Sequence, residues 1–216
     1  NGPDFNLLYQ LPTGGGKTVL ASHSIGIVRK EYLKLDSCVV LWIVPTNQIK
    51  NQTLNALKDK KHPYRIALET TNDCPVEIMD LQEAMLSGKE KFDQTICIVV
   101  TTMAALRIED IEGRKIYESN GYLMNHFVDI NEIQKSFLEK GENGEVLYSL
   151  ANVFKMRRPI VIIDEAHNAR TPLSFDSLKR FSPSAIIEFT ATPQRKQEPE
   201  RGYFASNVLH SVSASE

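Results

Sequence analysis

The sequence predicts an α/β protein in which a mostly parallel sheet is covered by helices on both faces. A glycine-rich loop at residues 12–16 follows a short apolar segment and precedes a helical apolar pattern. A β-branched run at residues 161–163 is apolar throughout, as in a strand buried on both faces of a parallel sheet. Apolar runs elsewhere alternate with helical stretches, which is the order of elements in parallel α/β sheets.

Six apolar segments are expected to form the strands. They lie near residues 5–10, 37–44, 64–68, 95–101, 159–164 and 185–190. A helix is expected directly after the glycine-rich loop, because apolar residues recur there with helical spacing. These residues are Ala21, Ile25, Val28, Tyr32 and Leu35. Two more helices are expected at residues 131–139 and 145–155, joined by a turn-rich tip at 140–145.

The glycine-rich loop has the composition of a phosphate-binding loop. Glycine permits positive φ and lets backbone N–H groups approach an anion, and the positive end of the following helix favours phosphate. Lys17 would reach the β- and γ-phosphates of a nucleotide, and the Thr18 hydroxyl would bind Mg²⁺. The expected contacts to ATP come from Pro12, Thr13, Gly14, Gly15, Gly16, Lys17 and Thr18. The usual pattern begins with glycine, whereas this chain has Leu11.

Two adjacent carboxylates, Asp164 and Glu165, follow the apolar run at its carboxyl end. In open α/β sheets ligands bind beside the carboxyl ends of the strands. Asp164 is therefore expected to hold Mg²⁺ and contact ATP, with Glu165 as the general base that activates water near the γ-phosphate. His167 lies two residues later and is a third candidate, as a catalytic or coupling residue. Thr190 and Thr192 end the next apolar run and are expected to couple nucleotide state to the rest of the domain.

These motifs together resemble the first RecA-like domain of superfamily 2 helicases and translocases. Residues 11–18 resemble helicase motif I, residues 164–167 the DEAH form of motif II, and residues 190–192 motif III. Residues 44–48 resemble motif Ia and residues 101–103 motif Ib. The matches occur in family order from residue 11 to residue 193. The resemblance implies a RecA-like P-loop NTPase fold with ATP and Mg²⁺ as cofactors.

The resemblance also implies a nucleic-acid surface. Its expected residues, which would face the phosphodiester backbone, are Pro45, Thr46, Gln48, Thr101 and Thr102. Short hydroxyls and amides at strand ends can contact phosphates without reading bases. The alternative is that these residues cap the helices that follow, since threonine and asparagine are favoured caps.

Within the superfamily, the chain most resembles the restriction subunit of type III restriction enzymes. The hints are residues 164–168, residues 187–193 and the long segment before the DEAH motif. This implies movement on double-stranded DNA, with RNA as the alternative track. It also implies a second RecA-like domain in the same polypeptide and a methylation and specificity subunit as partners. Residues 1–194 are expected to form the ATP-binding domain with an insertion at about 108–156, and residues 195–216 a linker. The isolated domain is expected to hydrolyse ATP very slowly.

The composition of the chain bears on its size class, its partners and its possible functions. The chain has 216 residues, 42% of them hydrophobic, which is enough for one substantial core. Its net charge of −2 gives no bulk basic field for nucleic acid. Three cysteines without metal-ligand spacing indicate reduced thiols and a cytoplasmic location, and no apolar run has the length of a membrane span. A regulatory P-loop switch without nucleic acid is the competing function. A nuclease site is rejected for this segment because no Glu-x-Lys occurs in it.

Overall fold

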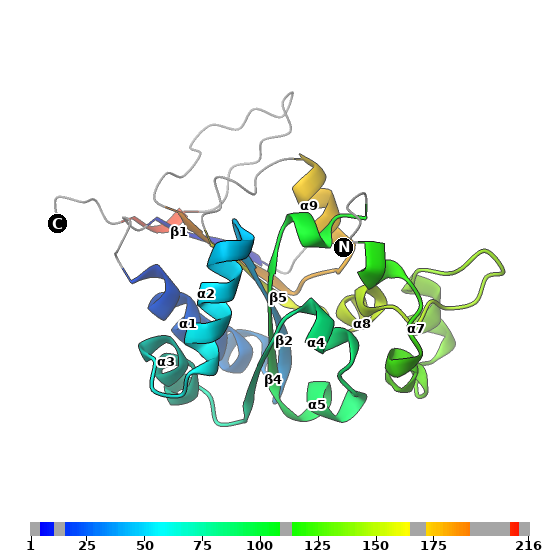
Figure 1. The fold of residues 1–216 in the computed structure, drawn as a ribbon, viewed down its shortest axis with the longest axis horizontal. Coiled ribbons are helices and arrows are strands. Elements are labelled where there is room, and N and C mark those ends of the chain that lie inside the picture. Colours follow the sequence, from blue (N-terminus) through cyan, green and yellow to red (C-terminus); the bar gives the residue numbers. More distant parts are fainter. Residues whose placement is uncertain (1–4, 11–15, 109–113, 165–171, 191–207, 212–216) are drawn as a thin grey trace.

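The computed structural model describes residues 5–10, 16–108, 114–164, 172–190 and 208–211 (Figure 1). For residues 5–10, 172–175 and 208–211 it describes the backbone alone. Seven described strands form one sheet in the order β3-β4-β2-β5-β6-β1-β7, and all their pairings are parallel. The strands are β1 Phe5–Gln10, β2 Cys38–Val44, β3 Val76–Met79, β4 Ile96–Thr102, β5 Ile160–Asp164, β6 Ala185–Thr190 and β7 Val208–Ser211.

Helices cover both faces of this sheet (Figure 1). The α-helices are α1 Lys17–Ile27, α2 Asn47–Lys58, α3 Pro63–Thr71, α4 Leu81–Met85, α5 Lys89–Gln94, α7 Glu132–Phe137, α8 Leu150–Arg157 and α9 Pro172–Lys179. A π-helix, η1 Val28–Leu33, continues α1, and three 3₁₀ segments are η2 Ala104–Leu106, η3 Lys115–Tyr117 and η4 Gly121–Phe127. The predicted α/β class with helices on both faces is confirmed.

The strands bury both of their faces because neighbouring residues point into two different cores. In β2, Val39, Leu41 and Ile43 belong to the core beneath α5, α8 and η4. The alternate residues Val40 and Trp42 belong to the core beneath α1, α2 and α3. Side chains alternate across a strand, so a strand between two helical layers must be apolar at every position. This is why the β-branched runs were visible in the sequence.

One predicted strand is wrong. Residues 64–68 lie in helix α3, and the strand in this part of the chain is the four-residue β3. Three local features start and support the helix: the His62 ring accepts a hydrogen bond from the Tyr64 N–H at 3.3 Å, Pro63 occupies the first turn, and Arg65 pairs with Glu69 at 2.8 Å. Proline is favoured at a helix start, and a pair four residues apart stabilises a helix.

The segment after β4 is built from short elements and ends in a helix of the core. The helix predicted at 131–139 is α7, and the helix predicted at 145–155 is α8, which begins at Leu150 after its Ser149 cap. Val153 and Phe154 of α8 are buried against the sheet, so α8 is the helix that returns the chain to β5. The tip predicted at 140–145 is a turn closed by an antiparallel bridge between Lys140 and Val146.

The last described strand, β7, pairs with β1. It lies within residues 195–216, where the sequence predicted a linker and no strand. Its four residues carry too few apolar positions to distinguish a strand from a connecting segment by periodicity. None of the helices in the described part of the chain combines the length and the apolarity that a membrane span would need.

Gly26 of α1 lies against Thr71, the last residue of α3. A Cβ placed there would lie 2.7 Å from the Thr71 carbonyl oxygen and 2.8 Å from the Thr71 Cβ. We expect Gly26→Ala to destabilise the protein by about 1–3 kcal/mol through this clash, even though alanine favours the helix by about 1 kcal/mol. Urea unfolding measures the difference. The control is Gly121→Ala, because a Cβ there meets no atom within 4 Å. Equal stability of the two variants would contradict the close contact.

His126 is a buried neutral group. Its Nε2 lies 3.0 Å from the Ser87 carbonyl oxygen, its ring packs edge-on against Phe92, and its side chain is nearly inaccessible. Burial lowers the pKa of His126 below its ordinary value of 6.5. The charged groups that face it are Arg157, Asp93 and Lys89. The pKa of Asp93 is lowered: burial raises it, but hydrogen bonds from Lys89 and Arg157 outweigh that effect, so Asp93 titrates in a more acidic range.

Stability should therefore fall as the pH drops below about 6.5, the ordinary pKa of histidine. In that range the unfolded chain binds a proton at His126 and the native state does not, so the free energy of unfolding decreases until the native pKa is passed. Thermal unfolding between pH 7.5 and pH 5 tests this. His126→Gln can still donate to the Ser87 carbonyl and does not titrate, so its curve should be flatter. Parallel curves for the two proteins would rule His126 out as the cause.

Candidate nucleotide and nucleic-acid site

The carboxyl ends of three neighbouring strands bring the predicted nucleotide-binding motifs together. In the parallel register, Gln10 at the end of β1 pairs with Thr190 at the end of β6. Asp164 at the end of β5 pairs with Phe189 of the same strand β6. Adjacent strands are about 4.8 Å apart, so β1 and β5 end roughly 10 Å from each other, with Thr190 between them. The strands next to the predicted motifs are therefore neighbours in the sheet, and their carboxyl ends lie at the same edge.

Gly16, the described end of the glycine-rich loop, has the positive φ that the sequence analysis associated with glycine in such a loop. Gly16 adopts a left-handed conformation with φ of 74° and stands directly before α1. Among the described residues no side chain caps α1, and its first turn carries no acidic residue, so its first backbone N–H groups are free of a side-chain cap from this part of the chain. Such an end favours an anion. Pro12, Thr13, Gly14 and Gly15 lie outside the described residues.

Lys17 is the first residue of α1 and is only 8% exposed, and Thr18 behind it is half-buried. A buried lysine at a helix start is a costly arrangement unless an anion or another partner compensates its charge. Asp164 is half-buried at the end of β5. Thr190 is buried at 1% exposure at the end of β6. Glu165, His167 and Thr192 lie outside the described residues, so their roles stay predictions.

The donor set suits a nucleotide with Mg²⁺. Mg²⁺ in nucleotide sites takes few protein ligands and completes its shell with phosphate oxygens and water. Thr18 and Asp164 offer one hydroxyl and one carboxylate of the kind required. Among the described residues no cluster of three or more histidines, cysteines and acids could hold a metal by itself.

The ends of β2 and β4 continue the same edge of the sheet. Val44, the last residue of β2, pairs with Thr102, the last residue of β4, and Ile43 pairs with Ile163 one residue before Asp164. The predicted nucleic-acid residues therefore lie beside the nucleotide motifs. Of these, Pro45 is half-buried, Thr46 and Gln48 are exposed, and Thr101 and Thr102 are buried.

The capping alternative is realised for two of these residues. Thr46 is the N-cap of α2, where its hydroxyl accepts from the Ile49 N–H at 3.2 Å. The Thr102 hydroxyl accepts from the Ala105 N–H at 3.3 Å and supports η2. A hydroxyl that accepts a backbone hydrogen bond still has its own proton to donate. Capping therefore fixes the Thr46 hydroxyl on an exposed surface and leaves its donor available to a phosphate oxygen.

Comparisons with known proteins agree with this assembly of motifs. A family model described as "Type III restriction enzyme, res subunit" matches residues 3–195. The chain belongs to this family. The all-parallel sheet with helices on both faces is the α/β architecture that the sequence predicted. A search of curated proteins gave no match. A solved structure of the UvsW helicase from bacteriophage T4 aligns with 12% identity and a TM-score of 0.46 over 94% of this chain, which spans 53% of that helicase chain.

Two lysines near this edge of the sheet were not predicted as site residues. Lys50 lies one turn after Thr46 on α2, so helical spacing from the motif could have identified it. Lys115 begins η3, far along the chain, and only the fold brings it to this edge. Both line a cavity that also includes Thr101.

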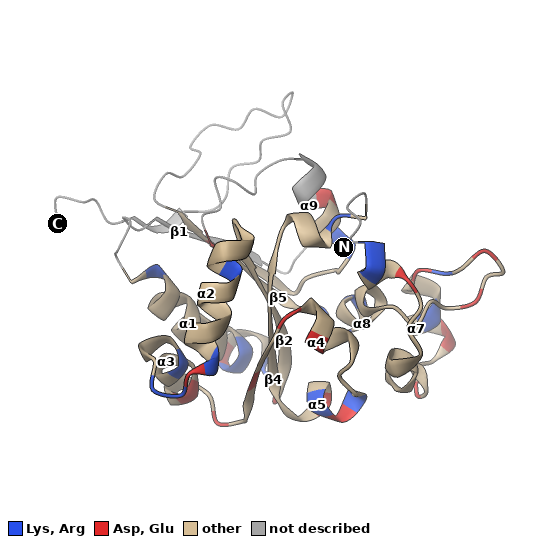
Figure 2. Cartoon of the chain, viewed as in Figure 1, with Lys and Arg blue, Asp and Glu red and all other residues tan. Residues whose placement is uncertain are grey.

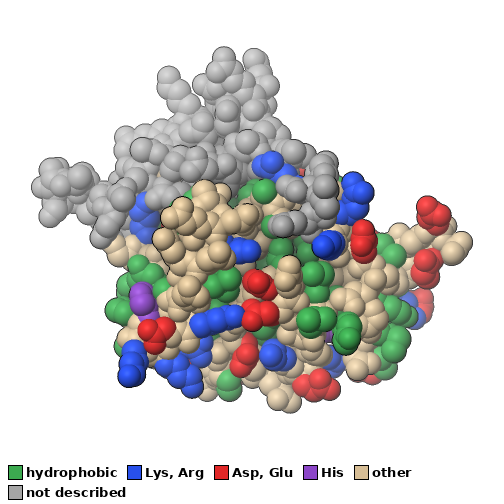
Figure 3. Space-filling model, in the orientation of Figure 1, with side chains coloured by type: hydrophobic (Ala, Val, Ile, Leu, Met, Phe, Trp, Pro, Cys, Tyr) green, Lys and Arg blue, Asp and Glu red, His purple; other side chains and the backbone are tan. Residues whose placement is uncertain are grey.

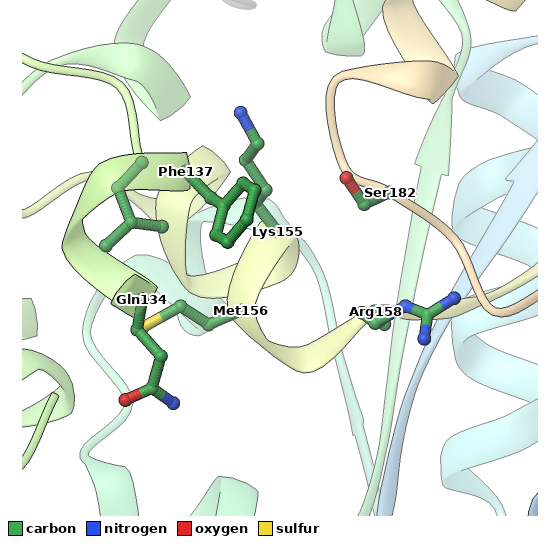
Figure 4. Close-up of a pocket in the computed structure, with 7 residues that line it drawn as sticks. Gln134, Phe137, Lys155, Met156, Arg158 and Ser182 are labelled. Atoms are coloured by element: carbon green, nitrogen blue, oxygen red, sulfur yellow. The ribbon is translucent and has the colours of Figure 1, made fainter. Parts of the chain in front are cut away.

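Another cavity lies away from this edge of the sheet. It encloses about 410 Å³ between α7, α8 and the turn before β6, and Figure 4 shows Phe137 and Lys155 facing it opposite Ser182 and Arg158. Arg158 and Ser182 precede β5 and β6, so this cavity is at the amino edge of the sheet. It is therefore separate from the nucleotide motifs.

Proposed function

We propose that this chain is the ATP-binding first motor domain of a DEAH-type translocase that couples ATP hydrolysis to movement along DNA, within a type III restriction subunit. The observation that supports the proposal is the strand register, which aligns the ends of β1, β6 and β5, the strands next to the three proposed nucleotide motifs. Family membership supports the helicase-type activity.

In this proposal each motif has a separate task. The loop backbone through Gly16 and the first turn of α1 would bind the phosphates, and the Lys17 ammonium would contact the β- and γ-phosphate oxygens. Thr18 and Asp164 would hold Mg²⁺, which supplies charge compensation for those oxygens. Glu165 would accept a proton from the attacking water. Thr190, between β1 and β5, is in the right place to sense both nucleotide motifs.

Coupling to movement would use the other half of the same edge. Thr46, Gln48 and the β4 end would contact the phosphodiester backbone, which suits a motor that must not read sequence. A second RecA-like domain would supply an arginine to the transferring phosphate, an effect of about 10³–10⁵ in rate. A methylation and specificity subunit is the proposed protein partner. We expect very slow hydrolysis by this domain alone.

The decisive experiment measures ATP hydrolysis by a longer polypeptide that includes the following domain. Double-stranded DNA, single-stranded DNA and RNA are added in turn, and a reaction without nucleic acid is the reference. We expect stimulation by double-stranded DNA. Stronger stimulation by RNA would show that the motor moves along RNA and not along DNA. Equal rates with and without every nucleic acid would favour a regulatory switch and overturn the motor proposal.

A further inference from the structure

A polar cavity of about 320 Å³ opens where β3 and β4 end, next to the end of β2. Its lining comes from five elements: β4, α4 with its N-cap, α2, and the 3₁₀ segments η2 and η3. The residues named by this argument are Thr101, Asp80, Gln82, Lys50 and Lys115. The sheet edge is thus divided. The ends of β5, β6 and β1 carry the nucleotide motifs, while those of β2, β4 and β3 carry this cavity.

The cavity presents two lysines without acidic partners. Neither Lys50 nor Lys115 has a carboxylate within 4 Å among the residues that the structure describes. Some other lysines of the described surface are paired, for example Lys58 with Glu83 at 2.7 Å and Lys89 with Asp93 at 2.8 Å. An anionic ligand would compensate the two ammonium groups without breaking an existing ion pair.

The one acid in the lining is already engaged. Asp80 caps α4: its Oδ1 accepts from the Glu83 N–H at 2.9 Å, and its own N–H donates to the Glu83 Oε2 at 2.9 Å. Lys58 neutralises Glu83 from the outside. The capping interaction orients the Asp80 carboxylate along the helix start, where the helix dipole offsets its charge. The net local charge is therefore set by the two lysines.

Neutral donors complete the site. The Thr101 hydroxyl makes only a long hydrogen bond of 3.4 Å to the Thr102 carbonyl oxygen, which it can exchange for a phosphate oxygen at little cost. Gln82 adds an amide. Two cations, a hydroxyl and an amide are groups that proteins use to hold a phosphodiester backbone.

The wall that carries Lys115 is firmly held. The adjacent residues Ile116 and Tyr117 are buried, and the Tyr117 hydroxyl donates to the Leu106 carbonyl at 2.8 Å. The Arg180 guanidinium stacks over the Tyr117 ring at 4.5 Å. Lys115 itself is exposed. Because the backbone beside Lys115 is already held in place, binding has to order the Lys115 side chain but not this part of the backbone. This wall belongs to the segment 108–156 that the sequence predicted as an insertion.

From these observations we propose that the cavity holds a phosphate of the nucleic-acid strand, and that the segment after β4 contributes Lys115 to that track. The inference rests on the proposed function and extends it, because it assigns part of the nucleic-acid contact to residues outside the helicase motifs. The overall charge distribution agrees with a local site. Figures 2 and 3 show Lys, Arg, Asp and Glu interspersed, with no single-sign face in this view.

The test compares nucleic-acid binding by the full chain and by Lys50→Ala, Lys115→Ala and the double variant. Fluorescence anisotropy with labelled single- and double-stranded oligonucleotides gives the affinity across a salt series. Each single variant should bind about 3- to 10-fold more weakly and flatten the slope of log affinity against log salt by roughly 0.7–0.9, the value for one lost phosphate contact. The double variant should bind more weakly than either single variant. Lys115→Arg should restore binding.

Lys61→Ala is the matched control, because Lys61 is exposed beyond the far end of α2. It should bind like the wild type. Thermal unfolding checks that every variant is folded, and ATP affinity should be the same in all of them. Wild-type affinity and salt slope in the double variant would overturn the cavity assignment while leaving the proposed function intact. If the wild type bound no oligonucleotide, with or without ATP, the cavity assignment and the proposed track would both fail.

A competition experiment distinguishes binding of a nucleic-acid phosphate in the cavity from binding of free inorganic phosphate. Millimolar inorganic phosphate is added as a competitor at constant ionic strength. Little competition beyond that of a neutral salt is expected, since a strand gains affinity from several contacts along the edge. Complete displacement of the oligonucleotide by phosphate, lost in the double variant, would instead identify a free-anion site and overturn the inference.

Discussion

Replacing Lys17 with alanine should lower the affinity for ATP by about 100-fold or more. Lys17 is buried at the start of α1, next to the left-handed Gly16 and an uncapped helix end. Charge-assisted hydrogen bonds to phosphate contribute about 1.5–3 kcal/mol each, and roughly 3 kcal/mol corresponds to a factor of about 100 in the dissociation constant. Titration calorimetry with ATP at fixed Mg²⁺ measures the change.

Two further variants make this result specific. Glu165→Gln should retain ATP affinity and lose hydrolysis by roughly 10²–10⁴-fold in the longer polypeptide, because the amide cannot accept the proton from water. Lys61→Ala removes an exposed positive charge far from the loop and should change neither property. Unchanged ATP affinity in the folded Lys17→Ala protein would show that the nucleotide does not bind at this loop.

The elements predicted correctly from the sequence are those that a short stretch of neighbouring residues specifies. The apolar run that ends at Asp164 is β5, and the glycine-rich loop does precede a helix that begins at Lys17. Both follow from short-range pattern: continuous β-branched residues for a strand buried on two faces, and glycines before a helical repeat. The convergence of the two motifs required the strand order, in which β6 separates β1 from β5.

Two features of the fold differ from what the sequence pattern indicated: the geometry of the first helix after Ile27, and the strand β3. Tyr32 and Leu35 belong to the apolar spacing that predicted the first helix, yet they are 53% and 41% exposed. The helix widens into the π-helix η1 after Ile27, which shifts the angular position of every later residue, and Arg29 is buried instead. The short strand β3 was missed for a related reason, because four residues give too little periodicity.

The buried Arg29 is the basis of the second large effect, a loss of stability. Its Nη1 donates to the carbonyl oxygens of Leu35 and Asp36, both at 2.8 Å, which fixes the turn between η1 and β2. Its Nε donates to the Asn72 side chain at 3.3 Å, and its Nη2 bonds Asp73. One side chain therefore ties the start of η1 both to the segment before β2 and to the end of α3.

Arg29→Met should lower the free energy of unfolding by about 2–4 kcal/mol, because two backbone carbonyls lose their charged donor and methionine cannot replace it. For a domain of this size that corresponds to a decrease in Tm of roughly 4–16 °C. The matched variant is Asp73→Asn. The Arg29 guanidinium holds the pKa of Asp73 below its ordinary range, but the Asp73 side chain is 70% exposed. An exposed partner contributes little, so Asp73→Asn should leave the free energy of unfolding nearly unchanged.

The contrast between these two variants separates the ion pair from the backbone contacts. If the ion pair dominated, both substitutions would lower stability to the same extent, and the loss would shrink at high salt. If the carbonyl contacts dominate, as the two 2.8 Å bonds indicate, Arg29→Met alone should be strongly destabilising, and its loss should be nearly independent of salt. Urea unfolding of the three proteins at low and high salt decides between them. Arg29→Met should weaken ATP binding only in proportion to the fraction of protein that is unfolded, because ATP is expected to bind the folded state alone.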